Sequence, residues 1–193
     1  SWYAVASTAI VPTNESTLVF ANGATVDTSG RLQLSSKGMA TTAGPVFDSV
    51  QWNWSILAKI KPESITEELV PLISDSTGPI LMLYKDASGT PLLYVATTGN
   101  SIPAYDLMDG SEHWVAMISR KNYPGGSDGT FLFIDNDVDF NVPVSSSETI
   151  LDGGPIQFAG PNSSDNGYAG TFDDLFIFSR PVDETEYLET TEQ

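Results

Sequence analysis

The sequence predicts an all-β protein, a sandwich of two antiparallel sheets followed by one short C-terminal helix. Apolar and polar residues alternate in short runs such as 31–34, and this two-residue period is typical of a strand with one buried face. Glycine and proline, 16 and 12 of the 193 residues, separate these runs along the chain. Many short strands divided by turn residues indicate a sandwich rather than a helical or α/β fold.

Taken in chain order, the elements begin with an N-terminal extension over residues 1–24, in which 2–10 and 17–20 could each supply a strand. The clearest later strands are expected at 54–60, 69–73, 80–84, 92–97, 114–119, 131–135, 156–159 and 172–178. Short helices are expected at 63–69 and 183–189, the second with Asp183 as N-cap and Glu186 completing a capping box. No repeat or linker divides the chain, so we assign residues 1–193 to one domain.

Composition excludes several functions. Eight basic and 25 acidic residues give a net charge of 8 − 25 = −17, which repels nucleic acid and anionic membrane surfaces. No uninterrupted run of apolar residues exceeds five, so we expect no membrane insertion. Cysteine is absent and His113 is the only histidine, which excludes disulfides, thiol catalysis and metal sites built from several cysteines or histidines.

Several segments carry a family resemblance. They read WSILAKIKP at 54–62, EHWVAMIS at 112–119, GTFLFIDNDV at 129–138 and GTFDDLFIFSRPVD at 170–183, preceded by an opening loop DTSG at 27–30. In this order they resemble the strands of laminin-G-like domains in the concanavalin-A-like lectin and glucanase superfamily, although Glu112 stands where that family has tryptophan. The resemblance covers roughly residues 25–190 and implies a jelly-roll sandwich.

No catalytic constellation accompanies the resemblance. The chain lacks the Glu-x-Asp-x-x-Glu strand of glucanases on this fold and the arginine-rich strand of its alginate lyases. We therefore expect no enzyme but an extracellular recognition module, on a cell or virion surface, that binds a glycan or a surface glycoprotein in adhesion. Two alternatives stay open: a structural or attachment subunit of an appendage, adhesin or viral spike or capsid protrusion, and a divergent polysaccharide hydrolase or lyase. In the first alternative the N-terminal segment would join a neighbour's sheet by strand addition.

Two sets of site residues follow. Flat aromatic rings near loops and strand ends suit sugar stacking, and the candidates are Trp52, Tyr105, Tyr123 and Tyr168. The family resemblance implies a structural calcium ion where the opening loop meets the closing strand, with Asp27, Asp173 and Asp174 as ligands, oxygen donors of the kind calcium prefers. Because neighbouring residues on a strand point to opposite faces, we expect only one of Asp173 and Asp174 to face such a site.

Overall fold

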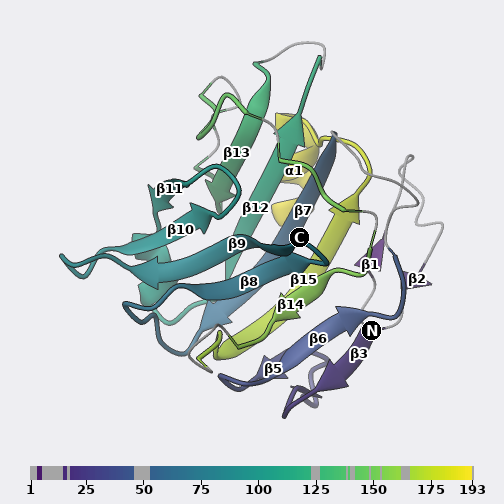
Figure 1. Cartoon of the computed structure of the whole chain (residues 1–193), viewed down its shortest axis with the longest axis vertical. Helices are drawn as coiled ribbons and strands as arrows, with labels where there is room; N and C mark the ends of the chain where they lie inside the picture. The colour runs from purple at the N-terminus through teal and green to yellow at the C-terminus, as the bar shows by residue number, and fades with distance from the viewer. Residues whose placement is uncertain are drawn as a thin grey trace.

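The computed structural model describes residues 4–5, 15–16, 18–45, 53–122, 127–137, 139, 142–147, 149–152, 154–161 and 166–192. Two antiparallel sheets of seven and six strands pack face to face, and a short α-helix follows the last strand (Figure 1). The predicted all-β jelly-roll sandwich is thus confirmed. No helix in these ranges is long and apolar enough to span a membrane.

The seven-stranded sheet lies nearer the viewer in Figure 1. Its spatial order is β11 (Asn100–Pro103), β10 (Pro91–Val95), β9 (Gly78–Lys85), β8 (Val70–Asp75), β14 (Gln157–Ala159), β6 (Met39–Thr42) and β3 (Leu18–Ala21). Behind it, the six-stranded sheet has the order β13 (Gly129–Ile134), β12 (His113–Arg120), β7 (Trp54–Pro62), β15 (Gly170–Phe178), β5 (Leu32–Leu34) and β4 (Thr25–Val26). A separate ribbon pairs β1 (Ala4–Val5) with β2 (Glu15–Ser16).

The main core fills the space between the sheets. Both sheets contribute one face of alternating apolar side chains, among them Ile56, Leu83, Phe158 and Phe172, each almost wholly buried. Trp54 belongs to the same core, and its indole Nε1 donates a hydrogen bond to the carbonyl of Thr149 at 2.7 Å. This bond satisfies the one polar atom that the ring brings into the core.

A second core lies on the outer face of the six-stranded sheet. Trp114, Phe131 and Phe133 project there and form one cluster with Tyr187 of α1 (Glu184–Thr191), whose ring packs against Phe133. Strand β12 is therefore apolar on both faces, with Val115 in the main core and Trp114 in the second core. The strand expected at 114–119 is confirmed, because it forms most of β12.

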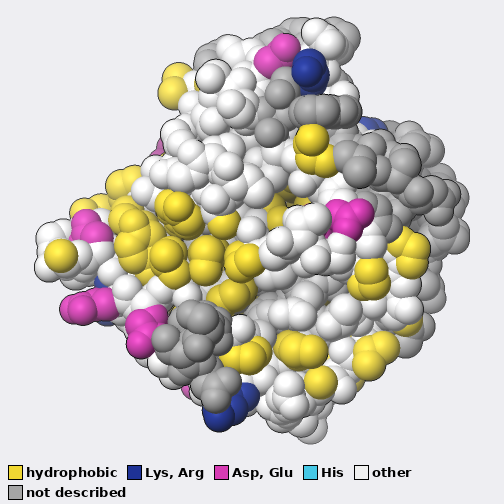
Figure 2. Space-filling view, viewed as in Figure 1, with side chains coloured by type: hydrophobic (Ala, Val, Ile, Leu, Met, Phe, Trp, Pro, Cys, Tyr) yellow, Lys and Arg dark blue, Asp and Glu magenta, His cyan; other side chains and the backbone are white. Residues whose placement is uncertain are grey.

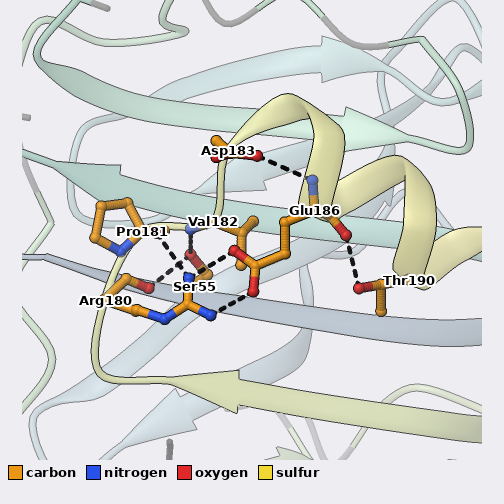
Figure 3. A network of polar contacts seen from close by, with 7 residues as sticks. All are labelled: Ser55, Arg180, Pro181, Val182, Asp183, Glu186 and Thr190. Carbon is orange, nitrogen blue, oxygen red and sulfur yellow. Dashed lines mark hydrogen bonds and ion pairs between the residues drawn. The ribbon is translucent and has the colours of Figure 1, made fainter. Parts of the chain in front are cut away.

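Polar contacts fix α1 to the sheet (Figure 3). Asp183 caps the helix, because its Oδ1 accepts the Glu186 N–H at 2.9 Å. The Ser55 hydroxyl accepts the Val182 N–H at 2.8 Å and donates to the Arg180 carbonyl at 3.0 Å. Only half of the expected capping box forms, because the Glu186 carboxylate pairs with the Arg180 guanidinium.

The helix expected at residues 63–69 is wrong. This segment contains bends but no helical turn, and Ile65 inserts into the main core. The connection 105–108, in contrast, forms a short 3₁₀ helix, η1 (Tyr105–Met108), which the alternation pattern did not predict.

Candidate functional site

The outer face of the seven-stranded sheet carries an aromatic and apolar patch. On β9 and β10 the inward side chains are Leu81, Leu83, Leu93 and Val95. Their alternating neighbours Met82, Tyr84, Leu92 and Tyr94 point the other way and are partly exposed. We call these four residues the open-face patch; Figure 2 shows hydrophobic side chains gathered over these strands, with acidic side chains at the margin.

Strand register brings the patch together. Leu92 lies opposite Tyr84, and Tyr94 lies opposite Met82 on one side and Ser101 of β11 on the other. The two tyrosine rings have centroids 6.0 Å apart and stand at 86° to each other. A ligand could therefore meet one ring face on and the other at its edge.

The tyrosine hydroxyls in the patch are uncommitted. Neither the Tyr84 hydroxyl nor the Tyr94 hydroxyl has a hydrogen bond to any residue that the structure describes, whereas the hydroxyls of Tyr168 and Tyr187 donate to backbone carbonyls at 2.9 and 2.6 Å. A tyrosine whose ring is partly exposed and whose hydroxyl has no partner can both stack on a ligand and hydrogen-bond to it.

Uncharged polar groups lie on this face at β14 and β6. Gln157 and Thr41 lie opposite each other across β14 and β6 and face outward, because Phe158 and Ala40 between the sheets are buried. Across the strands of this sheet only Asp75 and Lys85 are charged, and each is the last residue of its strand. The middle of the face thus combines aromatic rings, hydroxyls and an amide.

The four aromatic residues predicted from the sequence fare differently. The prediction for Tyr168 is wrong. Its side chain is almost fully buried in the core, where the ring packs edge-on against Phe172 at 5.2 Å, so it offers no surface to a sugar. Tyr105 is 64% exposed at the start of η1, beside the Pro91 end of β10. Trp52 and Tyr123 lie outside the described residues.

Tyr84 and Tyr94 were not among the binding residues predicted from the sequence. They stand inside the apolar runs 80–84 and 92–97, which predict strands but do not show which residues face the core. A signal was available in the first run only, where Leu81 and Leu83 alternate with Met82 and Tyr84. The second run reads Leu-Leu-Tyr-Val at 92–95 and shows no such alternation.

Asp27, one of the predicted calcium ligands, forms an ion pair with Arg31. The Oδ2 of Asp27 pairs with the Arg31 Nε at 2.9 Å, and its Oδ1 accepts the backbone N–H groups of Ser29 and Arg31. The Arg31 backbone N–H is the main cause that holds the pKa of Asp27 below its ordinary value. Arg31 also reaches Glu112 at 3.0 Å. Among the described residues, no three acidic or histidine side chains form a group that could hold a metal ion.

The expectation that Asp173 and Asp174 point to opposite faces of the strand is wrong. In β15 the register against β7 shifts between Phe172 and Leu175, which lie opposite Ile60 and Ala58. Both neighbours of the pair point into the main core, so the two aspartates form a bulge opposite a single β7 residue and share the outer side. Burial, followed by the charge of Asp174, raises the pKa of Asp173.

His113 is held between two carboxylates. Its Nδ1 lies 2.7 Å from Asp135 Oδ2 and its Nε2 lies 2.9 Å from Asp109 Oδ1. Burial of the ring opposes a positive charge, but the hydrogen bonds to Asp135 and Asp109 outweigh it and raise the pKa of His113. Because both ring nitrogens are engaged, this side chain is placed to link β12 to its neighbouring loops rather than to exchange protons with a substrate.

No protein-family model matches the chain, and no curated protein matches it significantly. Solved structures do resemble it. Domain 4 of AbnA, a GH43 extracellular arabinanase from Geobacillus stearothermophilus, was solved with arabinotriose; it is 15% identical over 93% of this chain and 84% of its own, with a TM-score of 0.56. The receptor-binding domain of a botulinum neurotoxin mosaic serotype C/D is 14% identical over 98% of this chain, with a TM-score of 0.64.

A third similar structure is a Trypanosoma rangeli sialidase in complex with sialic acid, 14% identical over 81% of this chain, with a TM-score of 0.57. The chain spans about half of the toxin domain (49%) and about a quarter of the sialidase (26%). At these identities the likeness establishes the fold alone.

Proposed function

We propose that this chain is a non-catalytic carbohydrate-recognition module, and that its ligand lies on the outer face of the seven-stranded sheet. The observation that carries the proposal is the perpendicular pair Tyr84 and Tyr94, whose rings are partly exposed and whose hydroxyls have no partner among the described residues. Sugar rings present flat C–H faces and many hydroxyls, which match this combination of aromatic surface and uncommitted polar groups.

The structural neighbours support this choice of ligand class. The arabinanase domain was solved with arabinotriose and the sialidase with sialic acid, and cell entry of a similar botulinum neurotoxin, type C, depends on two ganglioside molecules. Fold alone does not determine function, so the argument rests on the patch. The neighbours and the laminin-G-like segments together favour an extracellular or surface location and a role in attachment.

Two variants of the patch test the proposal. Tyr84→Ala and Tyr94→Ala remove a ring from the face but little from the core, so we expect each to weaken binding on a glycan array while the domain stays folded. Tyr→Phe at either position keeps the ring and should lose less. Lys61→Ala is the matched control, because Lys61 is exposed on the opposite sheet.

Parental binding by both alanine variants would contradict this placement of the site. Tyr105→Ala, read in the same experiment, asks whether the ligand extends from the patch past the Pro91 end of β10 onto η1.

A second candidate function, assembly, has its own observation. One edge strand of each sheet exposes apolar side chains, with Val19 55% and Phe20 41% exposed on β3, and Val26 43% exposed on β4. An exposed apolar edge invites pairing with another chain. If the domain assembles here, light scattering should find oligomers in the parent and monomers in a Val19→Lys, Phe20→Lys variant; a monomeric parent at high concentration would exclude it.

A further inference from the structure

We infer that the ligand of the open-face patch is an uncharged oligosaccharide, and that sialylated, sulfated or uronate-bearing glycans are rejected. This inference rests on the proposed function and names its ligand class. It follows from where the chain keeps its few positive charges.

All three arginines are committed on the six-stranded sheet. Arg31 pairs with Asp27 and Glu112, and Arg180 pairs with Glu186. Arg120, at the end of β12, is almost fully buried, lies over the Phe131 ring at 4.4 Å and donates from Nε to the carbonyl of Ser127. A carboxylate or sulfate group on a sugar is usually bound by a guanidinium in a bidentate geometry, and no arginine is placed to provide one on the open face.

None of the lysines projects from the patch. Lys59 and Lys61 belong to β7 of the other sheet, with the Lys59 ammonium over the Trp114 ring at 5.8 Å, Lys37 lies in the turn between β5 and β6, and Lys121 directly follows β12. Lys85 is the one basic residue on a strand of the seven-stranded sheet. It follows Tyr84 directly in β9, so its side chain leaves the strand on the side opposite to the patch.

Charge therefore disfavours the binding of acidic sugars both at short range and at long range. At short range, an anionic group pressed against Met82, Leu92 and the tyrosine rings would lose water without gaining a counter-charge, which is costly. At long range, the net charge of −17 repels an anion before contact. A neutral sugar meets neither penalty, and its hydroxyls can hydrogen-bond to the hydroxyls of Tyr84 and Tyr94.

A glycan array with matched neutral and acidic members tests the inference on the full chain. The probes are N-acetyllactosamine beside its sialylated and sulfated forms, and neutral arabinan and xylan oligosaccharides beside glucuronoxylan and polygalacturonate. We expect binding to one or more neutral members, at least about tenfold weaker binding to the acidic partner of the same backbone, and little loss of neutral binding at 1 M sodium chloride.

The outcomes separate the two proposals. Equal or stronger binding of acidic members that depends on Tyr84 and Tyr94 would overturn the neutral-ligand inference and leave the glycan-binding function standing. No binding to any member would overturn the proposed function itself. An acidic-glycan signal that is lost at 1 M salt and unchanged by Tyr84→Ala would show that acidic glycans bind at a different surface. That result would contradict the inferred rejection of acidic glycans.

A gain-of-function variant tests the stated cause. Ser101 is exposed and lies directly opposite Tyr94, so Ser101→Arg places a guanidinium at the rim of the patch. We expect it to raise binding of the acidic members severalfold, whereas Ser101→Gln, of similar reach without charge, should not. If Ser101→Arg leaves neutral binding intact and acidic binding unchanged, missing positive charge is not the reason for the selectivity.

Discussion

The two outer faces of the sandwich use aromatic residues in opposite ways. On the six-stranded sheet, Trp114 stacks with Phe176 at 5.9 Å and Phe133 packs against Tyr187 at 5.6 Å beneath α1. On the seven-stranded sheet, Tyr84 and Tyr94 form a comparable pair that stays partly exposed. The C-terminal helix makes the difference, because it covers one sheet and leaves the other uncovered.

This contrast separates structural aromatic residues from available ones. The Tyr187 hydroxyl donates to the carbonyl of Asp135, so that ring is fixed at both ends. The Tyr84 and Tyr94 hydroxyls have no such bond to the described residues. An aromatic residue thus becomes a candidate for binding through the lack of a cover and of a hydroxyl partner, rather than through its place near a loop.

The largest expected effect is a loss of stability when a ring is removed from the second core, on the outer face of the six-stranded sheet. Trp114→Ala removes a large buried ring and should cost about 3–5 kcal/mol of unfolding free energy. Tyr94→Ala on the open face should cost clearly less, because its ring is already partly in water. Denaturant titrations of both variants measure the difference. Equal costs would show that the two faces are not distinguished by coverage.

Loosening the helix should have an intermediate effect. Asp183→Ala removes the side chain that accepts the Glu186 N–H, and loss of such a cap costs about 1 kcal/mol. Asp183→Asn retains an acceptor and should lose little. If α1 alone covers the second core, Asp183→Ala should also increase hydrogen exchange in β12 and β13 but not in β9 and β10; uniform exchange across both sheets would contradict this.

Stability should depend on pH through His113. Its folded-state pKa is raised above the ordinary value of 6.5, so the stabilising charge is fully present below pH 6.5 and is lost as pH rises through the folded value. We therefore expect the melting temperature to fall as pH rises above 6.5, in a range where carboxyl groups no longer titrate.

The control for this effect is His113→Gln, which cannot carry the charge between Asp109 and Asp135. Its melting temperature should be lower at pH 6 and nearly constant from pH 6 to 8. A parent protein that shows the same flat profile would mean that folding does not raise the pKa of His113.

Calcium binding at Asp27, Asp173 and Asp174 stays a prediction, and we expect its effect to be the smallest. Sodium chloride should raise the melting temperature, because salt screens the repulsion within a chain of net charge −17. A site would add a further rise with calcium over magnesium at matched ionic strength, absent in Asp174→Asn. Equal effects of the two ions would mean that the melting temperature responds to ionic strength alone and that no calcium site forms here.

The fold could be predicted from the sequence because a central strand that packs on both faces has a recognisable run of apolar residues. The run 114–119 predicts β12, and Asp183 predicts the start of α1. Other elements depend on the surroundings. Residues 63–69 have a helical pattern, but Ile65 is buried in the main core and the segment stays irregular.

The candidate site was harder to predict for a related reason. Tyr84 and Tyr168 have the same side chain, and only the tertiary structure shows that one is partly exposed and the other buried. The bulge at Asp173 and Asp174 likewise depends on pairing with β7, and strict alternation along the strand placed the two side chains wrongly.

The most direct test follows the four methionine methyl groups by NMR. Met82 lies in the open-face patch, Met117 in the main core, Met39 on β6 and Met108 on η1. With ¹³C-methyl-methionine protein titrated with the neutral oligosaccharide that binds best on the array, the Met82 signal should shift in a saturable way while Met117 stays in place. Saturable shifts that leave Met82 unchanged would contradict binding on the open face.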